Sequence, residues 1–480
     1  MEITQNWRDQ WGALLIAALA TGIVASLCYT PLVLVVLLVV PASIYFVKRP
    51  YELLLVMVFF IPFNFVFKVG PVPVAFELIK VFAWVPFIHT RKERESFLTS
   101  RFDKWFAILA GIICLSLIRS NDFPYTVKEC IRLISNLGLV YLSVNLINTR
   151  EKLLQVMRVI TASTFLVACY GFYQWAIQDY GALFWLVNPR LDTSLAHYRD
   201  TFWPWRDRII SVLTSEMELG HYFNMCLPIA IALWLMTGRM RITSKWLLFA
   251  LCMLAGLLLT FTFGSWLALP VTLGLFVLIL DQKRRWKLVA GFLVVLLVGV
   301  LLIAGPLWPV VEAKYSGAQI GSFAWDVLTR LKAWAFAFGT WRSHPIIGTG
   351  IGSYETLSAE SDWIGVGPIG AGSTPHETYL YLLAESGLIG FISIMTVLFS
   401  TIRNNLRLKR DPRFGLIALA LAFSVAVNLV GGFSDDSPFV GPHTGYLLWF
   451  VVGWSEAMLN LSRRAPELQD TPEPQVNGEG

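Results

Sequence analysis

Apolar runs of about 20 residues recur along nearly the whole chain, and this feature limits the folds that it can adopt. A helix of that length crosses the roughly 30 Å hydrocarbon layer of a bilayer with its backbone polar groups bonded internally. Hydrophobic residues make up 56% of the 480 residues and charged residues only 15%, unlike a typical soluble domain. The sequence therefore predicts an all-α polytopic integral membrane protein with about 12–14 transmembrane helices. The predicted spans are 12–28, 31–47, 51–69, 73–89, 105–118, 127–146, 153–177, 221–238, 246–262, 265–280, 288–306, 377–401, 414–432 and 443–461.

Basic residues are concentrated in alternate connections between these spans. They lie within 48–49, 91–104, 150–152, 239–245, 283–287 and 403–413. Because positively charged connections remain on the cytoplasmic side of a membrane, both termini are expected in the cytoplasm. The net charge of +6 follows from this bias and is no sign of nucleic acid binding. We expect membrane lipids as partners and no nucleic acid.

Two connections on the opposite, outer side are too long to be simple links. Both are rich in tryptophan and phenylalanine, which argues against disorder. The second is expected to contain an amphipathic helix from Trp325 to Trp341. The predicted organisation is 1–177 as N-terminal transmembrane helices, 178–220 as a first periplasmic segment, 221–306 as central transmembrane helices, 307–376 as a large periplasmic loop, 377–461 as C-terminal transmembrane helices and 462–480 as a disordered cytoplasmic tail.

The segment that leads into the span 377–401 contains a candidate catalytic histidine. Thr374 and Glu377 have the spacing of a capping box, and Pro375 falls at the first helical position. His376 is therefore expected in the first turn of a membrane helix. The positive end of the helix dipole should lower the pKa of its imidazole and favour the neutral form, which can accept a proton near pH 7. The same helix end attracts anions such as phosphates.

Two familiar classes of site are not predicted. The six cysteines fall in or beside apolar spans without a CxxC or Cys/His ligand spacing, so we expect no metal and no disulfide framework. The glycine-rich turn at 348–352 has no preceding strand and no following Gly-Lys-Ser/Thr, so it is not interpreted as a nucleotide-binding loop. We expect no cofactor.

Three motifs follow one another in the C-terminal half of the chain. They read Arg330-x-x-x-Trp334, then Pro345-Ile-Ile-Gly348-Thr-Gly350-Ile-Gly352-Ser-Tyr354, then Pro375-His376-Glu377-x-Tyr379-Leu380 followed by Glu385-x-Gly387-x-x-Gly390. This pattern resembles the O-antigen ligase and O-antigen polymerase superfamily. The resemblance is close over roughly 325–395 and looser over the whole chain, where it rests on the number of spans and the large outer loop.

The resemblance implies a metal-independent, inverting glycosyltransferase of polysaccharide biosynthesis in the bacterial inner membrane. Such enzymes transfer a glycan from an undecaprenyl-diphosphate carrier to an acceptor hydroxyl on the periplasmic side. Ligases use lipid A–core as the acceptor, and polymerases use a second lipid-linked glycan. Lipopolysaccharide ligation is the favoured interpretation, and polymerisation of O-antigen or exopolysaccharide is the alternative.

The resemblance also assigns roles to particular residues. His376 corresponds to the essential histidine, which acts as a base or only orients the acceptor. Arg330 corresponds to one of two diphosphate-binding arginines; for the other we choose Arg208, with Arg206 in reserve. Arginine suits this role because its planar guanidinium binds phosphate oxygens in pairs. The further candidates are Trp334 for substrate binding and Glu377, Glu385, Tyr379, Gly348 and Gly350 as supporting residues.

Ionisable residues within the spans leave two interpretations open. Glu77, Lys80, Glu129, Arg132 and Glu385 are all expected in the outer half of the membrane, where such groups are costly unless paired or wetted. They line either a polar cavity beneath the histidine or a set of internal pairs. A lipid-linked glycan flippase or transporter would also use many spans, but it predicts internal symmetry and functional groups at the midplane. A structural scaffold would need neither the arginines nor the histidine.

Overall fold

The computed structural model describes the chain in the following ranges: 45–46, 48–63, 68–69, 72–73, 80, 83–90, 97–120, 122–177, 208–213, 215–237, 243–262, 264–270, 290, 323–360, 375–436, 439 and 441–467. The predicted span 12–28, nearly all of 31–47 and 288–306, and the tail beyond residue 467 lie outside them.

Helices dominate the described ranges, and they follow the predicted spans closely. They are α3 (Pro50–Phe60), α5 (Trp84–Thr90), α6 (Asp103–Arg119), α7 (Phe123–Leu146), α8 (Arg150–Ile177), α11 (Glu216–Met236), α12 (Lys245–Leu259), α16 (Phe323–Ser343), α17 (Ser353–Glu360), α18 (Thr378–Arg407), α19 (Gly415–Gly431) and α21 (Thr444–Glu467). In the described ranges, α8, α11 and α18 are long and apolar enough to cross a membrane, and α3, α12 and α19 are shorter apolar helices. The predicted fold class, an all-α polytopic membrane protein, is confirmed.

One pair of predicted spans is interrupted. The spans 51–69 and 73–89 were expected to be helical throughout, but α3 ends at Phe60. Strands β1 (Lys68–Val69) and β2 (Val72–Pro73) then form a short antiparallel hairpin. The sequence between them is Gly-Pro, and neither residue type continues a helix readily.

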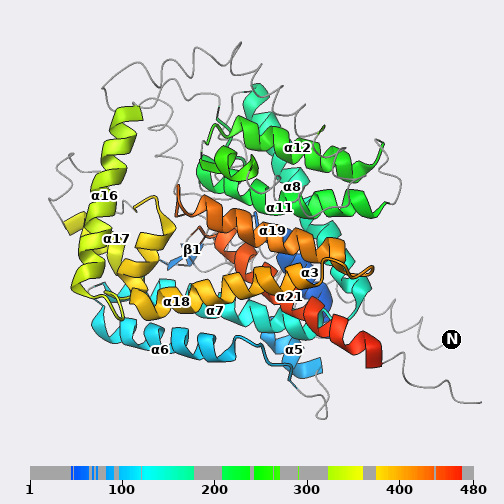
Figure 1. Ribbon diagram of the computed structural model, residues 1–480, viewed down its shortest axis with the longest axis horizontal. Coiled ribbons are helices and arrows are strands. Elements are labelled where there is room, and N and C mark those ends of the chain that lie inside the picture. The colour runs from blue at the N-terminus through cyan, green and yellow to red at the C-terminus, as the bar shows by residue number, and fades with distance from the viewer. Residues whose placement is uncertain are drawn as a thin grey trace, which may run out of the picture.

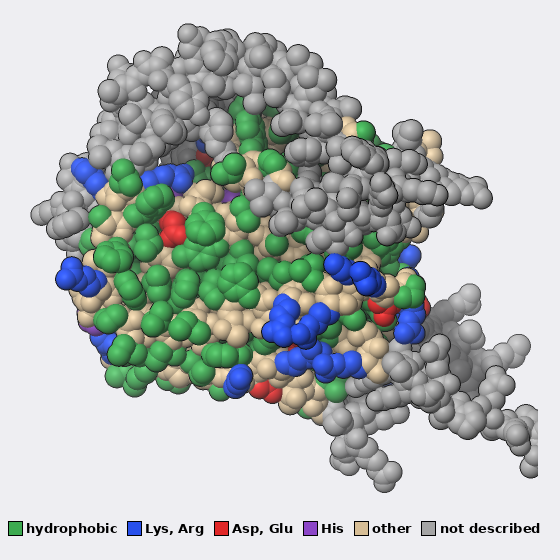
Figure 2. All heavy atoms as spheres, viewed as in Figure 1, with side chains coloured by type: hydrophobic (Ala, Val, Ile, Leu, Met, Phe, Trp, Pro, Cys, Tyr) green, Lys and Arg blue, Asp and Glu red, His purple; other side chains and the backbone are tan. Residues whose placement is uncertain are grey.

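The long helices pack into a bundle whose apolar faces meet (Figure 1). Helix α11 contacts α19 and α12, α7 contacts α21, and α18 contacts α6, α16 and α19. Buried side-chain hydrogen bonds cross these interfaces, as where the hydroxyl of Ser424 donates to the carbonyl of Met225 at 2.6 Å. Figure 2 shows a broad apolar face with Lys and Arg side chains gathered at its lower right. An exposed apolar surface of this kind is expected where a helix bundle faces lipid.

Helix α16 lies within the segment predicted as a large outer loop, and it confirms that Trp325 to Trp341 is helical. Its direction crosses that of α18, which it contacts (Figure 1). Helix α17 also contacts α18. The described part of this loop is therefore folded against the bundle.

The joint between this loop and α18 is formed by backbone hydrogen bonds. Gly387 interrupts α18 with φ 62° and ψ −170°. A continuous helix would join the N–H groups of residues 388 and 389 to the carbonyls of residues 384 and 385. All four groups instead bond to the loop at 345–350. The bonds are Leu388 N–H to Pro345 O at 2.9 Å, Ile389 N–H to Ile346 O at 3.1 Å, Thr349 N–H to Ala384 O at 2.9 Å and Gly350 N–H to Glu385 O at 2.9 Å.

The two glycine-containing motifs are thus the two halves of one joint. A Cβ atom at Gly348 would overlap the backbone of Glu385, and one at Gly387 would overlap the backbone of Gly348 and Ile346. Non-helical backbone within a membrane helix is tolerated where protein groups satisfy it. The loop at 345–350 supplies those groups, and it thereby fixes α16 against α18.

Replacing Gly387 with Ala should destabilise the protein strongly. Its backbone region is accessible essentially only to glycine and costs about 1–3 kcal/mol for other residues, and the new Cβ would overlap Ile346. Thermal unfolding of the detergent-solubilised protein measures the effect. Gly339→Ala in α16 is the control, because a Cβ there meets nothing within 4 Å. Equal melting temperatures for the two variants would contradict this account of the joint.

Candidate functional site

His376 lies immediately before α18, and its position differs from the predicted one. The helix begins at Thr378, and its N-cap is Glu377, whose carboxylate accepts a 2.6 Å hydrogen bond from the N–H of Leu380. The predicted capping box with Thr374 as N-cap is therefore wrong, and His376 is not in the first turn. Its φ of 48° is uncommon for a residue with a side chain. Such conformations cluster at functional sites, where surrounding contacts maintain them.

The segment that follows α19 is packed directly against the start of α18. The N–H of Thr378 donates to the carbonyl of Gly432, and its hydroxyl donates to the carbonyl of Asp435, both at 2.8 Å. These bonds bring Asp435 and Asp436 beside His376. Both aspartates are buried, whereas 44% of the His376 side chain is exposed.

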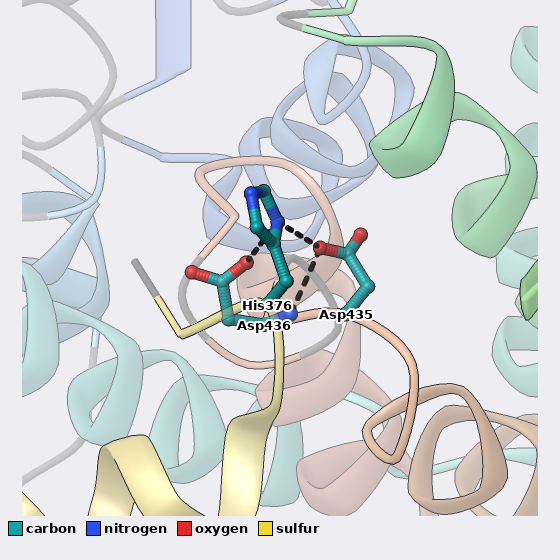
Figure 3. A group of neighbouring side chains, drawn as sticks. All are labelled: His376, Asp435 and Asp436. Atoms are coloured by element: carbon teal, nitrogen blue, oxygen red, sulfur yellow. Dashed lines mark hydrogen bonds and ion pairs between the residues drawn. The ribbon is translucent and has the colours of Figure 1, made fainter. Parts of the chain in front are cut away.

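The imidazole of His376 projects between the two carboxylates (Figure 3). Its Nδ1 lies 3.7 Å from Oδ1 of Asp435 and 4.0 Å from Oδ1 of Asp436, and its Nε2 points away from both. The three ligand atoms lie within 4.8 Å of one another, close enough to share a metal ion. We interpret the group as a histidine–carboxylate pair, because Oδ1 of Asp435 already accepts a 2.9 Å hydrogen bond from the N–H of Asp436.

These carboxylates reverse the expected electrostatics of the histidine. Partial burial lowers the pKa of His376, but its interaction with Asp435 and the charge of Asp436 raise that pKa more, against a smaller opposing effect of Arg330. The pKa of His376 is therefore raised, and the predicted lowering by the helix dipole is wrong. Burial alone would raise the pKa of Asp435, but His376 and His221 hold it well below its usual range.

Arg330 reaches the same segment from α16. One of its terminal nitrogens donates a 2.6 Å hydrogen bond to the carbonyl of Ser434, the residue before Asp435. Trp334, one turn further along α16, donates from its indole to the carbonyl of Pro375 at 3.0 Å. Arg330 therefore binds the backbone just before Asp435, and Trp334 binds the backbone just before His376. Arg330 brings a guanidinium to the site, and Trp334 holds the backbone that precedes the histidine.

Arg208 lies near the start of α11, and its guanidinium forms a 2.6 Å ion pair with Glu216. Glu216 is five residues before His221, about 7.5 Å along the helix, and His221 contacts Asp435. Arg208 is thus at the end of α11 that adjoins the site, with 13% of its side chain exposed. Arg206, the reserve candidate, lies outside the described residues.

Several buried polar residues at the site were not recognised in the sequence. Asp435 and Asp436 follow an apolar span in a short connection that the charge pattern predicts to be on the outer side, and an acidic pair in that place was an available signal. His221 is the first residue of the predicted span 221–238 and Glu218 falls at the end of the predicted segment 178–220, and neither was singled out. Glu218 accepts from the N–H of His443 at 2.8 Å and lies 3.0 Å from the Nδ1 of that residue, so it ties α11 to the start of α21.

The remaining candidates have structural contacts. The buried carboxylate of Glu385 accepts a 3.1 Å hydrogen bond from the N–H of Tyr354, in the first turn of α17. The hydroxyl of Tyr379 donates to the carbonyl of Leu429. Gly348 and Gly350 have positive φ values of 70° and 114° and form the loop side of the joint. Through these backbone contacts and turns, the four residues hold the segments that form the site in place.

The other ionisable residues of the spans also have partners. Glu129 forms an ion pair with Arg132, and Lys80 donates to the side-chain carbonyl of Asn136 at 2.8 Å. These contacts favour the internal-pairing interpretation over a polar cavity. Glu77 lies outside the described residues.

Comparison with known families agrees with the motifs. The sequence model of a family described as O-antigen ligase matches residues 248–395, a region that contains Arg330, Trp334 and His376. The resemblance to the O-antigen ligase and polymerase superfamily is thereby confirmed over this region. It supports a glycosyltransferase activity of the ligase or polymerase type in general. No curated protein matches the chain.

Removing the charge of Asp436 should lower the pKa of His376. An imidazolium is favoured by a nearby carboxylate, so Asp436→Asn makes the protonated ring less stable. Histidine NMR titration of protein labelled at the imidazole carbon measures this shift, with Asp411→Asn as a control in the connection at the other end of α18. An unchanged His376 pKa in Asp436→Asn would contradict the geometry of the site.

Proposed function

We propose that this protein transfers a glycan from an undecaprenyl-diphosphate carrier to an acceptor hydroxyl on the periplasmic face of a bacterial inner membrane. The observation that carries the proposal is the orientation of His376. Its Nδ1 faces the Asp435 and Asp436 carboxylates, and its Nε2 is directed away from them (Figure 3). A carboxylate behind one imidazole nitrogen makes the other a better proton acceptor and fixes its direction.

The reaction needs one proton transfer and one displacement. The Nε2 of His376 takes the proton of the acceptor hydroxyl while its oxygen bonds to the anomeric carbon of the donor sugar. The bond from that carbon to the diphosphate oxygen breaks, and its electron pair remains on the diphosphate. Attack opposite the leaving group inverts the anomeric centre. The negative charge that develops on the diphosphate requires fixed cations nearby.

Arg330 is suited to bind the leaving diphosphate. A guanidinium has five N–H donors, and the hydrogen bond of Arg330 to the carbonyl of Ser434 uses one of them. Arg208 is the second candidate, with Glu216 fixing its orientation. Each arginine lies at an element that also contacts the Asp435 segment, α16 in one case and the start of α11 in the other.

The position of the site along α18 supports a periplasmic reaction. His376 is at the N-terminal end of this helix, and Arg403 and Arg407 are at its C-terminal end. A 30-residue helix is about 45 Å long, so the two ends would lie on opposite sides of a bilayer. The positive-inside rule assigns the basic end to the cytoplasm and hence the histidine to the outer side, with both termini cytoplasmic.

We favour lipid A–core as the acceptor, which makes the protein an O-antigen ligase. Lipopolysaccharide from a strain that lacks the gene decides between this activity and polymerisation. Loss of the whole polymer ladder from an intact core supports ligation. A core that bears a single repeat contradicts ligation and assigns a polymerase.

His376→Ala should abolish most transfer, because it removes the proton acceptor. General base catalysis is worth about 10²–10⁴-fold, so kcat should fall within that range. The measurement is glycan transfer to acceptor by purified protein in lipid nanodiscs. His344→Ala is the control, since His344 is an exposed histidine at the end of α16. Undiminished transfer by His376→Ala would remove the proposed mechanism.

Arg330→Ala should lower kcat/KM for the donor on the order of 10- to 100-fold. This range corresponds to a hydrogen bond to a charged group, about 1.5–3 kcal/mol. Arg330→Lys should recover only part of the loss, because an ammonium cannot bind two phosphate oxygens in one plane. Arg342→Ala in the exposed last turn of α16 is the control. Equal kinetics for the Arg330 and Arg342 variants would exclude Arg330 from the diphosphate site.

A further inference from the structure

A second histidine contacts the carboxylate that supports His376. His221 lies in the second turn of α11, and only 2% of its surface is exposed. Its Nε2 lies 3.6 Å from Oδ2 of Asp435. His376 approaches the other oxygen of the same carboxylate, with its Nδ1 3.7 Å from Oδ1. Asp435 therefore lies between two imidazoles, one on each oxygen.

Separate contacts position the backbone and the carboxylate of Asp435. Its carbonyl accepts from the hydroxyl of Thr378 at 2.8 Å, which sets the position of the main chain. Rotation of the carboxylate about its terminal torsion, which is broad for aspartate, is limited at Oδ1 by the N–H of Asp436, which donates to that oxygen at 2.9 Å. A contact on Oδ2 restricts that rotation. His221 supplies such a contact, and it comes from a different helix than His376.

The backbone beside the buried His221 packs closely against two other segments. A Cβ at the neighbouring Gly220 would lie 2.5 Å from the hydroxyl of Ser265 and 2.6 Å from that of Thr262. A Cβ at Gly264 would overlap the side chain of Ser434. The absence of these side chains lets α11, the 262–265 segment and the Asp435 segment pack closely. The imidazole is thus buried on a helix whose neighbouring backbone is closely packed.

The charged groups around His221 and Asp435 come from the elements that pack together at this place. Helix α11 contributes Glu218, which pairs with His443 at the start of α21. Helix α16 contributes Arg330, and the segment after α19 contributes Asp436. The contact to Oδ2 of Asp435 comes from Nε2 of His221, 3.6 Å away.

We propose that His221 is a positioning residue: it holds Oδ2 of Asp435 so that Oδ1 remains on Nδ1 of His376. This inference rests on the proposed function, in which the Nε2 of His376 must face the acceptor hydroxyl. The separations of 3.6 and 3.7 Å are longer than hydrogen bonds. Catalytic hydrogen bonds are often long without substrate and shorten in the reacting complex. His221 keeps the carboxylate aligned for that change.

The test compares variants that differ in the donor at position 221. His221→Gln keeps an N–H donor at a similar reach, and His221→Leu replaces the ring by an apolar side chain. His221→Asn is a shorter polar replacement, for use if the leucine variant does not fold. Asp435→Asn gives the reference for a lost carboxylate charge. The pKa of His376 is measured by histidine NMR in the ligand-free protein, and transfer kinetics are measured on the same samples.

His221→Leu should shift the pKa of His376 downward toward its value in Asp435→Asn, and His221→Gln should leave it near that of the native chain. The kcat of His221→Leu should fall roughly 10- to 100-fold with little change in KM for the donor, as expected when a catalytic group is misaligned. In the Asp435→Asn background, His221→Leu should cause no further loss of kcat, because both changes remove the same alignment.

The proposal is overturned if His221→Leu leaves the pKa of His376 unchanged, or if its loss of kcat multiplies with that of Asp435→Asn. A purely structural role would produce such a product of losses together with a normal His376 titration. Failure of the proposed function has a different signature. In that case the native chain transfers no glycan, while the NMR titration of the ligand-free protein still decides whether His221 positions Asp435.

Discussion

Four backbone hydrogen bonds between the 345–350 loop and the break in α18 determine where the rest of the site can lie. A helix interrupted inside an apolar span exposes two N–H groups and two carbonyls, and each buried group without a partner costs about 1–3 kcal/mol. The loop satisfies all four, and its glycines allow the two backbones to approach. Since α16 leads directly into this loop, the joint also sets the distance from Arg330 to the start of α18. The glycine motifs therefore act on the chemistry through geometry, without contact with the substrate.

The site itself is built from segments that are far apart in the sequence. His376 precedes α18, Asp435 and Asp436 follow α19, Arg330 comes from α16, and His221 comes from α11. Opposite charges so placed in a partly buried environment interact more strongly than in water. The arrangement gives an imidazole with carboxylates on one side and a guanidinium nearby. A base and an anion-binding group at the membrane surface are what transfer from a lipid diphosphate requires.

The sequence predicted the helices well and the site incompletely. Span positions follow from the length and apolarity of local runs, so α7, α8 and α19 begin and end close to the expected residues, and α18 begins close to its expected start. The motifs indicated His376 and Arg330, and both contact the same segment in the structure. The N-cap was misassigned because Thr374 and Glu377 are both polar, and the choice depends on the turn that precedes the helix. The direction of the His376 pKa was wrong because only the dipole of its own helix was considered. The carboxylates that dominate arrive from about 60 residues away, through packing that no local pattern encodes.

The central claim is that one imidazole and its neighbouring guanidinium act on a single lipid diphosphate at the outer end of α18. The most direct measurement is a cryo-electron microscopy structure of the protein with an undecaprenyl-diphosphate-linked glycan bound. The account predicts phosphate oxygens within hydrogen-bond distance of the Arg330 guanidinium and the anomeric carbon on the Nε2 side of His376. A diphosphate bound at the basic end of α18, near Arg403 and Arg407, would contradict it.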